Sequence, residues 1–171
     1  KKVIRIADLM THTSGLPPYA SVTELEKRYG SPDPAGLMEY IATCKRDFKP
    51  QTDFQYSCLN FITLQHIIEN VSGKSLRDFA RENIFDVLGM NHTDYLPCRR
   101  DKNGQWTNTD LPHWAQTTDN HTTHSSLSTN RYALSDVAPT EKQADGQVLC
   151  GQVHDPLARI MNGGISGNAG V

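Results

Sequence analysis

The stretch from Ser57 to Val71 constrains the fold more than any other part of this 171-residue sequence. Its apolar positions are Leu59, Phe61, Ile62, Leu64, Ile67, Ile68 and Val71. They cover more than one stripe of a helix, so the stretch predicts a helix that is largely buried. A Ser-Gly pair follows directly and predicts where that helix ends.

Three weaker patterns predict further helices in the first half of the chain. Residues 4–10 carry an apolar stripe at helical spacing, and Gly15 is placed to cap it in the left-handed conformation. Residues 34–43 begin with a proline that follows an aspartate, and both are favourable at a helix start. Residues 75–84 begin with Ser-Leu-Arg-Asp, which resembles a capping box with aspartate in the usual place of glutamate.

The second half of the chain shows no such periodicity. Residues 97–133 are rich in Thr, Asn, Asp, His and Gln, which predicts a long irregular loop. Residues 162–171 gather small side chains, a composition that suits close approach of the backbone to a neighbouring element or a ligand. We therefore expect a single partial domain over residues 1–171, helical in 1–95 and irregular in 96–171.

Composition excludes two classes of protein. With 17 Lys and Arg against 19 Asp and Glu, the net charge of -2 offers no basic face for nucleic acid. No run approaches the roughly 18 consecutive apolar residues that a membrane-spanning helix needs. The apolar share of 37% is below the typical value of about 45–50%. A chain of this length with so few apolar residues is expected to have a thin core.

Metal and disulfide chemistry have little support in the sequence. The cysteines show no Cys-x-x-Cys pair and lie far apart, at Cys44, Cys58, Cys98 and Cys150. Free thiols are the expected state, rather than a zinc ribbon or a disulfide scaffold. His121 and His124, with His113 and Asp119 nearby, could bind a divalent metal, but two loop histidines are more often solvated. We expect no metal and no cofactor.

Five ordered segments resemble one family of enzymes. They read IADLMTHTSGLP (6–17), FQYSCLNF (54–61), VSGKSL (71–76), IFDVLGM (84–90), and APTE with VHDP (138–141 and 153–156) ahead of the Gly-rich end. These segments resemble the serine β-lactamase-like and penicillin-binding-protein-like hydrolases, which include class C β-lactamases, D-Ala-D-Ala carboxypeptidases and esterases. In that family a mostly helical region packs on an α/β sheet region, with the catalytic cleft between them. The resemblance implies a mainly α chain with long irregular loops and most of the sheet missing.

The resemblance assigns a catalytic role to Tyr56. Acyl transfer through a serine needs a group that removes the hydroxyl proton. A phenol with a pKa near 10 becomes a usable base beside a lysine ammonium, because the opposite charge favours the phenolate. In the family, the Tyr of the Tyr-x-Asn motif has this role. Taken alone, a Tyr before an apolar helix is more often a packing residue.

Cys58 stands where the family usually carries Asn, whose side chain orients the lysine and the substrate. A thiol is only a weak donor and acceptor, so this substrate-binding position is altered. A second, nucleophilic reading of Cys58 has little support, since no basic residue adjoins it. His154 and Asp155 read as a catalytic dyad in isolation, but the resemblance places them in a structural turn.

Two family motifs are absent from the sequence: Ser-x-x-Lys, which carries the nucleophile, and Lys-Thr-Gly or His-x-Gly. The chain thus looks like the middle portion of a serine hydrolase acting through an acyl-enzyme on β-lactam, D-Ala-peptide or ester substrates. Its partners would be that substrate and the missing sheet region, and by itself it is expected to be inactive. An alternative is a non-catalytic module that senses cell-wall fragments. Analogy implies a periplasmic or secreted location, and truncation predicts exposed apolar faces on helices 57–71 and 75–84.

Overall fold

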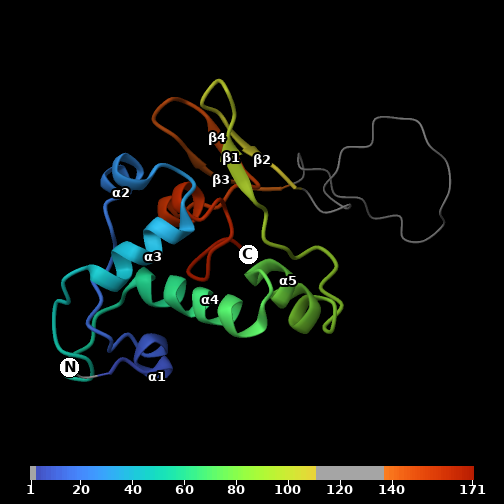
Figure 1. The fold of residues 1–171 in the computed structure, drawn as a ribbon. Helices are drawn as coiled ribbons and strands as arrows, with labels where there is room; N and C mark the ends of the chain where they lie inside the picture. Colours follow the sequence, from blue (N-terminus) through green and yellow to red (C-terminus); the bar gives the residue numbers. More distant parts are fainter. Residues whose placement is uncertain (1–2, 111–136) are drawn as a thin grey trace, which may run out of the picture.

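The computed structural model describes residues 3–110 and 137–171 (Figure 1). The helices are α1 (Ile6–Met10), α2 (Val22–Tyr29), α3 (Pro34–Thr43), α4 (Cys58–Ser72), α5 (Leu76–Ala80), and the π-helical turns η1 (Arg81–Phe85) and η4 (Leu157–Met161). The strands are β1 (Cys98–Arg100), β2 (Trp106–Asn108), β3 (Pro139–Lys142) and β4 (Val148–Cys150). Among the described helices, none has the length and apolar character needed to cross a membrane.

Helix α4 lies at the centre of the helical part. Helices α1, α3 and α5 all pack against it, and the C-terminal stretch lies beside it (Figure 1). Leu59 and Ile62 are almost completely buried in the main core. Gly73 ends the helix in the left-handed conformation, with φ 70°. The predicted helix is confirmed to within one residue at each end, and its buried residues are Leu59, Asn60, Ile62 and Gln65.

The predicted helix starts at Asp33 and Ser75 are also confirmed. The Asp33 carboxylate accepts a hydrogen bond from the Gly36 N–H at 3.0 Å, with Pro34 as the first helical residue. The Ser75 hydroxyl accepts from the Asp78 N–H at 3.1 Å. These side chains satisfy N–H groups that would otherwise lack partners at the helix ends.

Two features of the first half differ from the prediction. Helix α2 was not predicted, although Val22, Leu25 and Tyr29 have helical spacing and the Ser21 hydroxyl accepts from a first-turn N–H. The chain leaves α1 through a left-handed residue at His12, with φ 57°, three residues before the glycine that was expected to cap it. That early turn gives His12 a special position, which is described below.

Part of the stretch expected to be irregular is regular. Strands β1 and β2 form one antiparallel hairpin, and β3 and β4 form another. Strands of three or four residues are too short to show a period of two, which explains why the sequence did not reveal them. The expectation for residues 111–136 lies outside the described residues.

Buried apolar residues form two clusters. The main cluster joins α1, α2, α3, α4 and η4, and contains Leu9, Leu16, Ala20, Leu25, Leu37, Ile41, Leu59, Ile62, Leu157 and Met161. The second lies under α5 and η1, and contains Leu76, Ala80, Phe85 and Tyr95. The expected exposed apolar face on α4 is wrong, because only its last turn exposes a large apolar residue, Val71. Of the predicted helix 75–84, Ile84 is exposed, and other exposed apolar residues lie on α1 and in the turn after η1, including Ile6, Met10, Val87 and Leu88.

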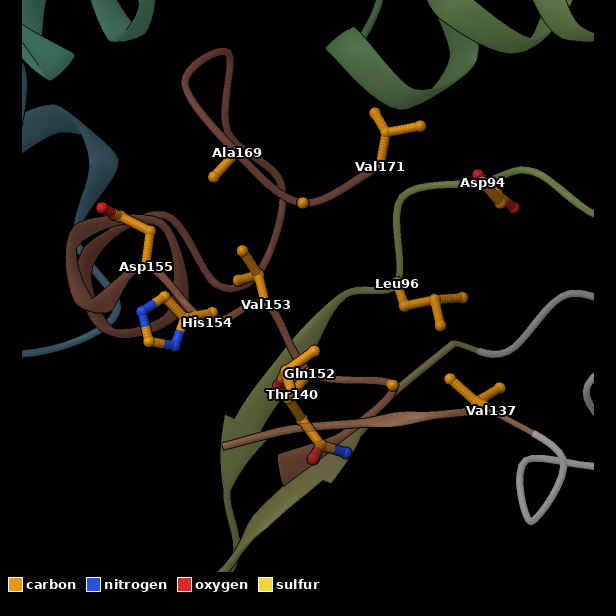
Figure 2. Close-up of a pocket in the computed structure, with 12 residues that line it drawn as sticks. Asp94, Leu96, Val137, Thr140, Gln152, Val153, His154, Asp155, Ala169 and Val171 are labelled. Atoms are coloured by element: carbon orange, nitrogen blue, oxygen red, sulfur yellow. The ribbon is translucent and has the colours of Figure 1, made fainter. Parts of the chain in front are cut away.

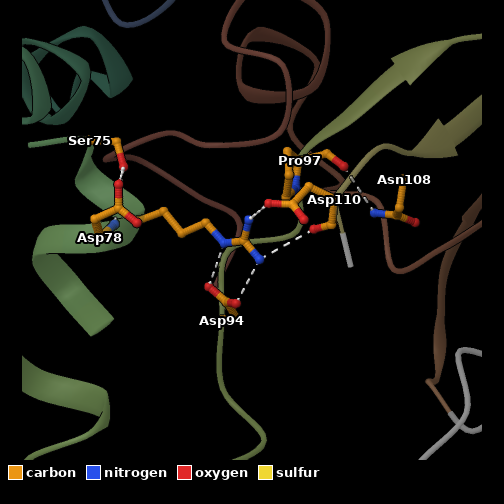
Figure 3. A network of polar contacts seen from close by, with 7 residues as sticks. Ser75, Asp78, Asp94, Pro97, Asn108 and Asp110 are labelled. Carbon is orange, nitrogen blue, oxygen red and sulfur yellow. Dashed lines mark hydrogen bonds and ion pairs between the residues drawn. The ribbon is translucent and has the colours of Figure 1, made fainter. Parts of the chain in front are cut away.

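A buried ion pair fixes α5 to the second half of the chain (Figure 3). Two nitrogen atoms of Arg77, Nε and Nη2, each donate to the Asp94 carboxylate at 2.9 Å. The side chains of both residues are at most 10% exposed. Nη1 also donates to the Asp110 carboxylate at 2.5 Å, but the side chain of Asp110 is 74% exposed. These bonds to carboxylates raise the pKa of Arg77, so the guanidinium stays charged.

Candidate active site

The first turn of α4 is held in place by a buried polar network. The Ser57 N–H donates to Nδ1 of His12 at 3.1 Å, and Nδ2 of Asn60 lies 3.0 Å from the same atom. The Ser14 hydroxyl donates to Oδ1 of Asn60 at 2.5 Å. Ser14, Ser57 and Asn60 are almost completely buried. Because buried polar groups with full sets of partners are rigid, the network fixes the residues around Tyr56.

Tyr56 lies at the mouth of this network, directly before α4. Its side chain is 59% exposed, so it is not a core residue. Its ring lies 4.4 Å from the His12 ring, between ring centroids, at an interplanar angle of 38°. The packing interpretation of Tyr56 therefore has no support from burial, and the phenol is accessible to a substrate.

Cys58 is half-buried, on the first turn of α4. Burial raises the pKa of its thiol, and the nearby Asp155 carboxylate raises it further. Hydrogen bonds to Sγ from the side chains of Asn168 and Tyr56 oppose this shift. A thiol with a raised pKa is mostly protonated and a poor nucleophile, so the environment of Cys58 favours a structural or substrate-contacting role.

The Gly-rich end of the chain places Asn168 next to Cys58. The Gly167 N–H donates to Oε1 of Gln65 at 3.0 Å. A Cβ at Gly167 would lie 2.2 Å from the carbonyl oxygen of Phe61, so only glycine permits this approach to α4. The Ser166 hydroxyl donates to Oδ1 of Asn168 at 2.6 Å. The predicted close approach of residues 162–171 to a neighbouring element is confirmed.

Tyr19 and Asp155 complete the cluster around Cys58. The Tyr19 hydroxyl accepts a hydrogen bond from the Leu157 N–H at 3.2 Å. Burial, followed by the Asp155 carboxylate, raises the pKa of Tyr19 to about 12. Asp155 also accepts from the Ala158 N–H at 2.8 Å, which caps η4. Sequence reasoning missed Tyr19 and Asn168, because neither belongs to a polar motif of its own.

His154 and Asp155 do not act as a pair. Nδ1 of His154 lies 2.8 Å from the Glu141 carboxylate, whereas the Asp155 carboxylate accepts a hydrogen bond from the Ala158 N–H in η4. This arrangement favours the structural interpretation of the two residues. The histidines considered for a metal, and Asp119, lie outside the described residues. Within residues 3–110 and 137–171, no three metal-ligating side chains gather at one point.

A pocket of about 380 Å³ lies beside the site, at the base of the β3–β4 hairpin. Figure 2 shows Asp94, Leu96 and Val171 around one part of it, and Thr140, Gln152 and Val153 around another. Tyr56 and Cys58 are not among its lining residues. It meets the surroundings of Cys58 through Asp155 and the backbone next to Asn168, so Tyr56 and Cys58 lie outside it.

Comparisons with known proteins decide the family. The Beta-lactamase family model matches residues 1–158. The chain belongs to the Beta-lactamase family. Within this family, the match covers the tyrosine segment, the polar network that holds it and the first turns of α4. The resemblance noted in the sequence is therefore confirmed at the level of the family.

The proteins that this chain resembles are longer than the chain itself. A protein of Escherichia coli (strain K12) named as a D-alanyl-D-alanine carboxypeptidase is 28% identical over all of this chain and 36% of its own length. An N-acetylmuramyl-L-alanine amidase of Bacillus subtilis (strain 168) is 28% identical over all of this chain and 35% of its own length. A penicillin-binding protein of Bacillus halodurans matches 61% of this chain and 37% of its own, at 26% identity with a TM-score of 0.44. The chain thus spans about a third of these curated relatives.

Proposed function

We propose that this chain supplies Tyr56, as an active-site residue, to a serine hydrolase that works through an acyl-enzyme. The observation that carries the proposal is the state of Tyr56, which is exposed yet fixed at the start of α4 by a buried network. Family membership makes hydrolase chemistry the expected activity. A Ser-x-x-Lys segment, which the 171 residues lack, would face Tyr56 and provide both the nucleophile and the cation.

In this proposal Tyr56 transfers the proton of the serine hydroxyl to the leaving group. The lysine ammonium would stabilise the Tyr56 phenolate, because a nearby opposite charge favours the ionised form. The phenolate accepts the proton of the serine hydroxyl as the serine attacks the substrate carbonyl, and returns it to the leaving group. Backbone N–H groups of the sheet region would hold the oxyanion. No metal or cofactor takes part.

Cys58 and Asn168 meet the substrate in this proposal. The Cys58 thiol occupies the position of the Asn in the family's Tyr-x-Asn motif. The side-chain amide of Asn168, from the Gly-rich end, forms a hydrogen bond with this thiol. The substrate would be a β-lactam, a D-Ala-terminated peptide or an ester. Two of the relatives bear names for cell-wall enzymes, which favours a peptidoglycan-derived substrate and a location outside the cytoplasm.

The test is Tyr56→Phe in a protein that joins this chain to a Ser-x-x-Lys segment. The substitution keeps the ring and removes one hydroxyl. We expect acylation by a chromogenic cephalosporin or ester to fall by about 10²-fold or more, the usual effect of a general acid–base residue. Tyr29→Phe is the matched control, since the Tyr29 hydroxyl donates to the exposed Glu39 carboxylate and contacts neither Tyr56 nor Cys58 through that bond. Unchanged turnover in Tyr56→Phe would refute the proposal.

Three further measurements separate the alternatives. Cys58→Asn restores the family motif and should preserve or raise activity. A loss of activity in this variant would indicate that the Cys58 thiol is the nucleophile. The isolated 171-residue chain should form no covalent adduct with a fluorescent penicillin. A stoichiometric adduct on the isolated chain, located by mass spectrometry, would place a nucleophile inside it. Tight binding of cell-wall fragments by the joined protein without turnover would support the sensing module instead.

A further inference from the structure

His12 occupies a position that the proposed reaction leaves unexplained. It follows α1 in the THTSG segment, and its φ of 57° lies in the left-handed region, where a non-glycine residue is uncommon. Its carbonyl oxygen accepts a hydrogen bond from the Gln55 N–H at 3.0 Å. Both its backbone and its side chain therefore contact the segment that carries Tyr56.

The hydrogen bonds around His12 admit one arrangement of protons. A backbone N–H can only donate, so Nδ1 of His12 must accept from Ser57. The Leu16 N–H donates to the Ser14 hydroxyl, which in turn donates to Oδ1 of Asn60. The amide nitrogen of Asn60 is then the atom that faces Nδ1. Two donors converge on this atom, which makes His12 a neutral imidazole with its proton on Nε2.

The same imidazole is surrounded by aromatic rings. The Phe61 ring of α4 lies at 5.4 Å with an interplanar angle of 36°. Tyr56 lies at 4.4 Å with an angle of 38°, and the edge contact with Phe54 is at 6.2 Å and 86°. Because Tyr56 is exposed, its described restraints are this ring contact and the hydrogen bond from its side chain to Sγ of Cys58.

We propose that His12 is a positioning residue, whose neutral ring is anchored to α4 through Nδ1 and serves as the platform that aims the Tyr56 phenol toward Cys58. This inference rests on the proposed function, because it explains how that function obtains a correctly placed proton acceptor. A displacement of about 1 Å at a reacting group can lower a rate by about 10²-fold. An exposed tyrosine without a platform would sample other rotamers and lose that alignment.

Two variants separate the ring from the anchor. His12→Asn keeps an acceptor for Ser57 and tolerates the left-handed backbone, but it removes the platform. His12→Phe keeps a ring beside Tyr56, but it leaves the Ser57 N–H and the Asn60 amide without their acceptor. We expect His12→Asn to fold and His12→Phe to lower the midpoint of thermal unfolding.

The first readout is NMR of the 171-residue chain. In the parent chain, Nδ1 of His12 should carry no proton and Nε2 should carry one. His12→Asn should shift the ring-proton signals of Tyr56 and leave those of Tyr40, on α3, unchanged. A proton on Nδ1, or Tyr56 signals that do not move in His12→Asn, would overturn the proposal.

The second readout is turnover in the protein that carries a Ser-x-x-Lys segment. His12→Asn should lower kcat by about tenfold to a hundredfold with KM unchanged, as expected for misplaced chemistry rather than lost binding. An unchanged kcat would overturn the positioning role. Tyr56→Phe in the same protein tests the proposed function separately: if it has no effect while the NMR result holds, the platform exists but the assigned reaction is wrong.

Discussion

Replacing Asp94 should reveal how much the buried ion pair with Arg77 stabilises the fold. Asp94→Asn keeps the shape of the side chain and removes its charge. The carboxylate accepts two hydrogen bonds from the guanidinium at 2.9 Å, and such charge-assisted bonds contribute about 1.5–3 kcal/mol each. In this variant the exposed Asp110 carboxylate still neutralises part of the positive charge of Arg77. We therefore expect a loss of about 3 kcal/mol in the free energy of unfolding, at the lower end of the range for broken buried pairs.

The matched control is Asp110→Asn, because Asp110 binds the same guanidinium from the surface. Its side chain is 74% exposed, and exposed pairs contribute less than about 1 kcal/mol. A double variant, Arg77→Met with Asp94→Leu, removes both charges and should cost less than Asp94→Asn alone. Urea unfolding followed by far-UV circular dichroism measures all three. Equal losses for Asp94→Asn and Asp110→Asn, or a double variant less stable than Asp94→Asn, would show that burial does not set the strength of this pair.

Three further predictions concern the neighbourhood of the site. Gly167→Ala should destabilise the chain by about 1–3 kcal/mol in urea unfolding, because the new Cβ would meet the Phe61 carbonyl at 2.2 Å; a neutral effect would mean that the C-terminal stretch moves freely away from α4. The pKa of Tyr19 rises to about 12 from its ordinary 10.0, so stability should be complete below pH 10 and decline as the pH rises toward 12, and Tyr19→Phe should reduce that decline in unfolding measured against pH. Burial raises the pKa of Cys98 to about 11 from 9.0, so at pH 8 its thiolate should be about 100-fold scarcer than in the unfolded chain. Iodoacetamide followed by mass spectrometry should modify Cys98 only after unfolding; alkylation of the folded chain at the unfolded rate would contradict this.

The sequence predicted helices well where a pattern spans several turns. The α4 pattern covers fifteen residues, and the predicted and observed ends agree because a left-handed glycine at Gly73 stops it. It predicted strands poorly, since β1 and β4 have three residues each and owe their form to pairing with a neighbour. A single short strand carries no period that can be read without its partner.

The residues of the candidate site also divide into those that a local sequence pattern reveals and those that only the fold brings together. Tyr56 and Cys58 belong to a local motif, so the resemblance identified both positions from the sequence. Tyr19 and Asn168 reach Cys58 only through the tertiary fold, and a close approach such as that of Gly167 to Phe61 depends on atoms that are far apart in the chain. His12 was within a quoted segment, but its role depends on a left-handed turn that residue type alone does not predict.

The long sequence separation across the site has a consequence for the order of folding. Gly167 and Gln65 are joined by a hydrogen bond across 102 residues, and Asn162 bonds the same glutamine across 97. Contacts of this kind are expected to form late, because closing so large a loop costs conformational entropy before the contacts can stabilise the fold. The helices around α4 can assemble from neighbouring segments before that closure. We therefore expect the half of the site that carries Asn168 to form last and to detach first under mild denaturant, which would remove the amide from Cys58 while the helical part remains folded.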